Sequence, residues 1–236
     1  MLKILEIIFF SLFIISCKKE LGSPGKIREE TRTVNDFNKI VLHHKINLVL
    51  TQDTLNKLTI RTGENIIAGI HTNVVDDVLT IENSRNSSMN QPSQQIDVFL
   101  SAKELETIEY LGSGNISSTN TLKAPVFTVV SQTGAGVIQL DIEATHTVAG
   151  IYEESADIIL SGKTNTAFVY CAPRGTINLK LLEAKKMNIY FSSVRNGYVW
   201  VTDELSGTNY HTGNILYKGN PVLQIITSGK GKFQPL

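Results

Sequence analysis

The stretch Gly112-Ser113-Gly114-Asn115-Ile116 contains the clearest copy of the short motif that decides the fold. The motif is glycine, any residue and an apolar residue, and the third of its copies has alanine in place of glycine. The seven copies are Gly114-Asn115-Ile116, Gly136-Val137-Ile138, Ala156-Asp157-Ile158, Gly175-Thr176-Ile177, Gly197-Tyr198-Val199, Gly213-Asn214-Ile215 and Gly231-Lys232-Phe233. They start 22, 20, 19, 22, 16 and 18 residues apart. Such a period indicates a stack of similar structural units.

Two further rows of residues test this alignment. Apolar residues predominate two positions after the motif (Ser118, Leu140, Leu160, Leu179, Val201, Tyr217, Pro235). They also predominate six positions before its glycine (Ile108, Val130, Gly150, Val169, Phe191, Gly207, Ile225). The position directly after the motif is mixed, and this alternation indicates strands with one face directed inward.

The sequence therefore predicts an all-β fold, a β-helix or β-solenoid over residues 105–236 with coils of about 20 residues. The alternative is a β-sandwich, but a sandwich does not require equivalent residues to recur at a fixed offset. We expect Ile116, Ile138, Ile158 and Ile177 to form one vertical file. We expect the glycines to occupy corners with positive φ, where a side chain would clash.

Residues 27–104 lack this register and predict irregular coils or a cap that continues the solenoid. Strands are expected near 38–51, 57–62, 66–72, 77–82 and 95–100. The polar segment Ser84 to Gln94 has no periodic pattern and predicts a loop. Because an open solenoid end exposes strand edges, we expect Gly219-Asn220-Pro221 and the last eight residues to blunt the other end.

The amino terminus resembles a bacterial lipoprotein signal. The apolar run Ile7 to Ile15 is too short for an ordinary transmembrane helix, and Ile14-Ile15-Ser16-Cys17 resembles a lipobox. We predict a signal peptide at 1–16, palmitate or a related acyl chain on Cys17, and a flexible tether over 17–34. The protein would then be an outer-membrane lipoprotein, either periplasmic or surface-exposed. The alternative is a plain secretory signal in which Cys17 is an ordinary residue.

Several stretches of residues 35–236 together resemble the putative auto-transporter adhesin family, also called the head GIN domain. They are Phe37-Asn38-Lys39-Ile40, Leu50-Thr51-Gln52, Val78-Leu79-Thr80-Ile81, Gly112-Ser113-Gly114-Asn115-Ile116 and Tyr217-Lys218-Gly219-Asn220-Pro221. The glycine pair is lost in the third to fifth coils, where Glu154-Ser155-Ala156, Pro173-Arg174-Gly175 and Arg195-Asn196-Gly197 stand. The resemblance implies a right-handed β-helix, a Bacteroidetes-type lipoprotein and an envelope role.

Composition and motifs exclude several kinds of chemistry. Twenty-two basic and 22 acidic residues balance, so no positive field predicts nucleic-acid binding. With two cysteines and no paired-histidine motif, we predict no metal site and no cofactor. If Cys17 is acylated, Cys171 is left as a small buried side chain. The scattered acids near one corner, Asp157 and Glu154 with Arg174 and Arg195 at neighbouring corners, predict a surface charge ladder rather than a catalytic pair.

Trp200, Tyr198 and Tyr190 are the predicted ligand-binding residues, because exposed aromatic rings can stack on sugars or seat a protein. We therefore predict a lipid-anchored, non-catalytic adhesin or binding module that presents a ladder surface to a glycan or an envelope protein. Two alternatives remain open at this point. One is a pectinase-like β-helical enzyme acting on polysaccharide, and the other is a structural or lipid-associated envelope protein.

Overall fold

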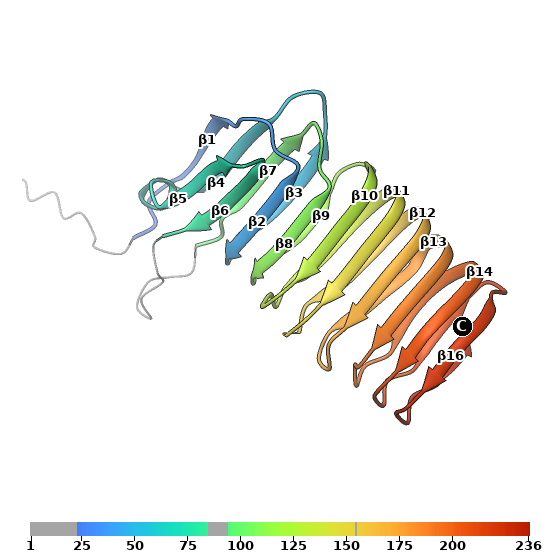
Figure 1. Cartoon of the computed structure of the whole chain (residues 1–236). Helices are drawn as coiled ribbons and strands as arrows, with labels where there is room; N and C mark the ends of the chain where they lie inside the picture. The colour runs from blue at the N-terminus through green and yellow to red at the C-terminus, as the bar shows by residue number, and fades with distance from the viewer. Residues whose placement is uncertain (1–22, 85–93, 154) are drawn as a thin grey trace, which may run out of the picture.

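The computed structural model describes residues 23–84, 94–153 and 155–236. The predicted signal peptide, Cys17 and Glu154 lie outside these residues, as does most of the predicted loop. The described chain is almost entirely strands, stacked as a column (Figure 1). The elements are β1 (Ile27–Thr33), β2 (Lys39–His44), β3 (Asn47–Gln52), β4 (Lys57–Gly63), α1 (Glu64–Ile67), β5 (Ile70–Val75), β6 (Val78–Asn83), β7 (Asp97–Ala102), β8 (Thr107–Gly112), β9 (Ile116–Ser118), β10 (Leu122–Ser131), β11 (Val137–Ile151), β12 (Asp157–Cys171), β13 (Thr176–Phe191), β14 (Gly197–Asn209), β15 (Ile215–Lys218), β16 (Val222–Thr227) and β17 (Phe233–Pro235).

The column is a β-solenoid of parallel strands, as the sequence predicts. The long strands β10 to β13 bend near residues 125, 145, 165 and 185, where the pairing register skips a residue, and the register of β14 skips residues 202–203. Each coil therefore contributes one segment to each of two layers. We call the layer with β6, β2, β8 and β16 sheet A. The layer with β7, β3, β9, β15 and β17 is sheet B.

The core lies between the two sheets and is built from vertical files. Ile116, Ile138, Ile158 and Ile177 pair in succession in sheet B, which confirms the predicted file. All four are buried. A file in sheet A runs through Ile108, Val129, Ala149, Val169 and Ile189. Stacking of like residues therefore buries one face of every coil, since no single coil can bury its own. The right-handed sense of the solenoid stays a prediction.

The glycines at the corners between sheet A and sheet B are required for a reason other than the expected one. None of the motif glycines has a positive φ, so the prediction on this point is wrong. A Cβ on Gly136 would instead overlap the carbonyl oxygen of Gly114, and one on Gly231 would overlap that of Gly213. We call these turns the glycine corners, and the glycines allow adjacent coils to approach closely.

Buried side chains hold the carbonyl groups of these corners. Tyr110 donates a hydrogen bond from its hydroxyl to the Gly114 carbonyl (2.5 Å), and Asn209 donates to the Gly213 carbonyl (2.8 Å). Ser193 donates to the carbonyl of Gly175 (2.7 Å). These contacts satisfy acceptors that the narrow corner removes from water.

The register in the later coils differs from the sequence alignment. Val199 pairs with Leu179 rather than with Ile177, so the fifth coil is displaced by two residues. The row six positions before the glycine also mixes two files. Val130 pairs with Gly150, and Gly150 pairs with Tyr170, so these residues form an outward file. Ile108 and Val169, in contrast, point into the core.

The amino-terminal end is capped by antiparallel pairs that extend both sheets. β1 and β4 extend sheet B beyond β7, and β5 extends sheet A beyond β6. Arg32 of β1 ties the two sheets together, because its guanidinium donates to the Ile70 carbonyl (2.7 Å) and to Thr72 Oγ1 (3.1 Å). The expected cap is thus present. β1, however, occupies residues that the predicted tether includes, and Ile66 and Ile67, placed in an expected strand, lie in α1.

Candidate functional site

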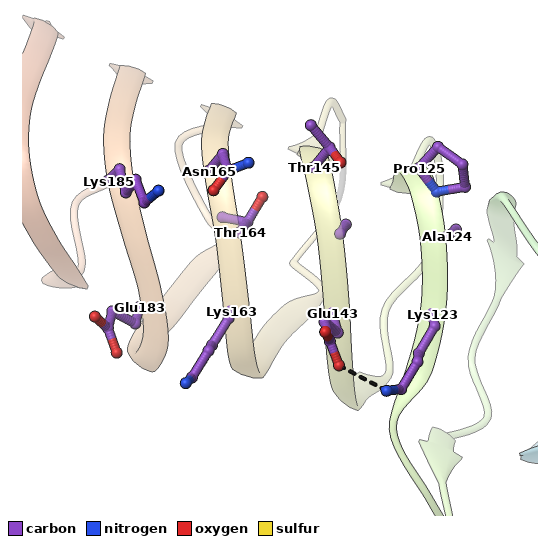
Figure 2. A pocket seen from close by; sticks show the side chains of 11 residues that line it. Lys123, Ala124, Pro125, Glu143, Thr145, Lys163, Thr164, Asn165, Glu183 and Lys185 are labelled. Atoms are coloured by element: carbon purple, nitrogen blue, oxygen red, sulfur yellow. Dashed lines mark ion pairs between the residues drawn. The ribbon is translucent and has the colours of Figure 1, made fainter.

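A shallow groove follows the bends that join sheet B to sheet A. Its volume is about 610 Å³, and it crosses β10, β11, β12 and β13 (Figure 2). Small side chains at the bends leave the hollow, because Ala124, Ala144 and Thr164 follow one another in register. The complete lining is Lys123, Ala124, Pro125, Glu143, Ala144, Thr145, Lys163, Thr164, Asn165, Glu183 and Lys185.

Charges alternate in sign along the sheet B side of this groove. Lys123, Glu143, Lys163 and Glu183 pair in that order from coil to coil. The ammonium of Lys123 lies 2.9 Å from the Glu143 carboxylate (Figure 2). Adjacent strands lie only about 4.8 Å apart, so like charges in this row would repel. The alternation therefore suits a ladder that stabilises stacking.

Trp200 continues the same row, since it pairs with Glu183 on one side and Lys218 on the other. The Lys218 ammonium lies 3.4 Å from the centroid of the Trp200 ring, a cation–π contact. Tyr198 lies two residues earlier on the outer face of sheet B, beside Leu216. Both aromatic side chains are half-buried. Lys218 occupies one face of the indole and leaves less of it for a ligand.

Tyr190 lies on the other layer, so the structure does not bring the three predicted aromatic residues together. Tyr190 belongs to the sheet A segment of β13, where it contacts Phe168 with ring centroids 5.7 Å apart. Tyr152 stacks on Tyr170 next to them at 5.0 Å. We call Tyr152, Phe168, Tyr170 and Tyr190 the aromatic patch.

The aromatic patch is open to solvent over much of its area. Tyr152, Phe168 and Tyr190 are 41%, 42% and 37% exposed. Tyr170 and Tyr190 are direct partners in the register, which places them side by side. Tyr190 was predicted from the sequence, and the other three residues were not. The 20-residue step from Tyr170 to Tyr190, one coil in length, was the signal that could have found Tyr170.

Two acidic side chains of the later coils form ion pairs with basic side chains. Asp157 lies 3.5 Å from Arg195, and Glu204 lies 3.2 Å from Lys186. The first pair joins two of the corner residues for which the sequence predicted a charge ladder. Within residues 23–84, 94–153 and 155–236, no group of three metal-ligating side chains comes together. These acids therefore offer no evident general acid and base pair.

Cys171 is fully buried in the sheet A core, in agreement with its predicted role. Its Sγ lies 3.5 Å from the Gly175 carbonyl oxygen at the neighbouring glycine corner. Burial raises the pKa of the thiol to about 12 despite a hydrogen bond with Ser193 that acts in the opposite direction. The thiol is therefore protonated and inert rather than nucleophilic.

Comparison with solved structures shows the same architecture in several bacterial proteins. The crystal structure of a putative adhesin from Bacteroides fragilis NCTC 9343 aligns with a TM-score of 0.82 at 21% identity, covering 91% of this chain and 99% of that one. A putative adhesin from Parabacteroides distasonis ATCC 8503 gives 0.68 at 19% identity, over 90% and 98%. A putative lipid binding protein from the same organism gives 0.67 at 20%, over 91% and 98%.

No curated protein matches the sequence. No helix in the part of the chain that the structure describes is long and apolar enough to span a membrane. The family model described as putative auto-transporter adhesin, head GIN domain matches residues 36–221. This match covers most of the chain, including the amino-terminal cap after β1 and all but the last coil of the solenoid. The chain therefore belongs to the putative auto-transporter adhesin, head GIN domain family.

Proposed function

We propose that this protein is a lipid-anchored adhesin of the cell envelope, which binds a glycan or an envelope protein and catalyses no reaction. The outer membrane is its location, with the acyl chain on Cys17 as its attachment. The observation that carries the binding role is the aromatic patch of Tyr152, Phe168, Tyr170 and Tyr190. Membership of an adhesin family supports a role at the cell surface or in the envelope.

The aromatic patch suits recognition of a sugar ring or an apolar side chain. An aromatic ring provides a large apolar face, and a tyrosine hydroxyl adds a polar group at the rim. The rings stand on adjacent strands of a continuous hydrogen-bonded sheet, so their backbones are held in place before a ligand arrives. Little ordering is then needed on binding, which favours affinity.

Two features support a binding role over the alternatives. The ion pairs Asp157–Arg195 and Glu204–Lys186 hold acids that a glycosidase or lyase would need free. The groove at the bends is shallow and is lined by lysine, glutamate and small side chains, without a large apolar side chain. It therefore suits an acyl chain poorly.

The test is a double substitution in the aromatic patch, Phe168→Ala with Tyr190→Ala. Both side chains are exposed, so the fold should survive, and binding should fall at least about tenfold because aromatic anchors dominate such contacts. Glycan arrays and pull-downs with envelope extracts measure the loss, and thermal melting followed by circular dichroism checks the fold.

The matched comparison is Tyr198→Ala with Trp200→Ala, which removes two aromatic side chains from sheet B. We expect this variant to keep most of the binding, because Lys218 already covers part of Trp200. If the sheet B variant loses binding and the sheet A variant keeps it, the binding surface belongs to sheet B. If neither variant changes binding, the aromatic residues have no part in it.

A further inference from the structure

The outer strands of the solenoid differ in how they are protected. At the amino-terminal end, β1 of sheet B carries four charged residues, Arg28, Glu29, Glu30 and Arg32. β5 of sheet A carries no aspartate, glutamate, lysine or arginine, but Arg32 donates to its Ile70 carbonyl and to Thr72 Oγ1. Charged side chains on an edge strand discourage pairing with another chain. At the other end, β16 has the sequence Val222-Leu223-Gln224-Ile225-Ile226-Thr227, without a charge or a proline. β16 is therefore an unprotected edge. The predicted blunting by Gly219-Asn220-Pro221 and the last eight residues does not cover it, because β17 pairs with β15 in sheet B.

β16 is also poorly covered. It pairs with β14, from Glu204–Val222 to Asn209–Thr227, and with no other described strand. Val222 and Ile226 are 66% and 63% exposed, and Leu223, which follows the buried Leu205 in its file, is 39% exposed. A strand with a free edge and apolar side chains can add a further strand by β-augmentation.

The charge around this edge indicates the chemistry of the strand that β16 could add. Residues 205–236 contain three lysines, Lys218, Lys230 and Lys232, and no aspartate or glutamate. Glu204, the register partner of Val222, is already paired with Lys186. The ammonium of Lys218 contacts Trp200, and no described acid forms an ion pair with Lys230 or Lys232. A second copy joined through the same end would bring two sets of lysines together. A segment that carries acidic residues would neutralise them.

We propose that β16 accepts an extended acidic segment of a partner protein as an additional strand of sheet A. The backbone of the segment would bond to the free edge of β16. Its apolar side chains would cover Leu223 and Ile226, and its carboxylates would meet Lys230 and Lys232 at the adjoining glycine corner. This surface lies apart from the aromatic patch and adds a second binding function to the proposed one.

The experiment selects peptides from a random displayed library by their binding to the purified protein. The expected result is enrichment of sequences that alternate apolar and polar residues and carry aspartate or glutamate. Enriched peptides should bind Lys230→Glu with Lys232→Glu at least about tenfold more weakly, since two charge pairs become repulsive. Ile226→Glu, which places an acid on β16 itself, should weaken binding similarly.

The matched control is Lys45→Glu with Lys103→Glu, which makes the same charge changes at two exposed lysines near the amino-terminal end, outside the charge ladder of the groove. This control and the Phe168→Ala with Tyr190→Ala variant should bind the peptides as the natural chain does. Enrichment without acidic residues, or equal binding by Lys230→Glu with Lys232→Glu, would overturn the proposal. So would a dimer in analytical ultracentrifugation that Ile226→Glu separates, because a second copy would then occupy β16.

Discussion

Single glycines set how closely adjacent coils approach. Gly114 and Gly136 lie one above the other, and the space for a side chain on Gly136 is already filled by backbone and by the Tyr110 hydroxyl. The backbone of a coil cannot move aside without breaking its bonds to both neighbours. The ring of Tyr110 lies against Gly134 in the same corner, so this part of the core has no spare volume.

Gly136→Ala should therefore lower the free energy of unfolding by about 3 kcal/mol, because the added methyl group must displace backbone. Gly150→Ala is the matched control. Its methyl group would meet the ring of Tyr152 and a methyl of Val130, which can turn away. We expect a change within about 1 kcal/mol for the control. Urea denaturation measures both, and equal losses would contradict the explanation by backbone overlap.

Cys171 gives the stability a dependence on alkaline pH. Burial raises the pKa of its thiol from 9.0 to about 12, so the unfolded chain loses this proton first as the pH rises. The contribution of the protonated, buried thiol to the free energy of unfolding is complete below pH 9 and is lost as the pH rises through 12. Each unit in this window costs about 1.4 kcal/mol. Buried Tyr110, with its pKa also raised to about 12, adds to the loss above pH 10.

Cys171→Ala should remove the first part of this alkaline loss. Urea midpoints measured from pH 7 to 10 should fall for the natural chain and change much less for the variant. The variant will be less stable at neutral pH, because it loses a buried sulfur atom. The slope with pH is therefore the quantity to compare, and parallel slopes would show that Cys171 does not titrate as described.

Elements of the solenoid were predictable from sequence because equivalent residues stack. A period in the sequence is a vertical file in space, so Ile116, Ile138, Ile158 and Ile177 could be placed together without coordinates. The two-residue displacement of Val199 could not be found in this way. A shift of two keeps the same face inward, so the apolar pattern fits either register. The bulge in β13 is a different irregularity, since it adds a single residue between Asn178 and Leu181, and Leu181 is 58% exposed.

The candidate site was harder to predict than the core. Which outward residues become neighbours depends on the register of each coil and on which sheet a segment joins. Tyr190 and Tyr198 are eight residues apart, yet a glycine corner separates them and they lie in different sheets. Phe168 lies one coil away from Tyr190 and contacts it. The amino-terminal cap lacks the repeat, so its order of strands could not be derived from periodicity.

At the scale of the whole molecule, the described chain begins at one end of the solenoid and finishes at the other (Figure 1). The segment that follows Cys17 leads into the cap at β1, and β16 lies at the far end. An acyl chain on Cys17 would therefore attach the capped end to the membrane and leave β16 remote from it. The aromatic patch lies on the side of the column between these ends.

Cys17→Ser should abolish incorporation of radiolabelled palmitate and release the protein from the membrane fraction. Replacing this one side chain is enough to release the protein, because the acyl chains on Cys17 supply the anchoring energy, about 0.8 kcal/mol for each buried methylene. Cys171→Ala is the matched control and should keep the label, since its thiol is buried in the core. Label that persists in Cys17→Ser would rule out this attachment.

The direction of the hydrogen bonds between coils has a mechanical consequence. These bonds run along the axis of the column, from one coil to the next, and the strands lie across it. Tension between an anchored cap and a ligand gripped at β16 would pull along the same axis. Bonds so aligned are loaded one coil at a time rather than all together, and each coil depends on its nearest neighbours. The protein would then lengthen as coils unfold one after another, and this extension would limit the peak force on an attached cell when flow suddenly increases.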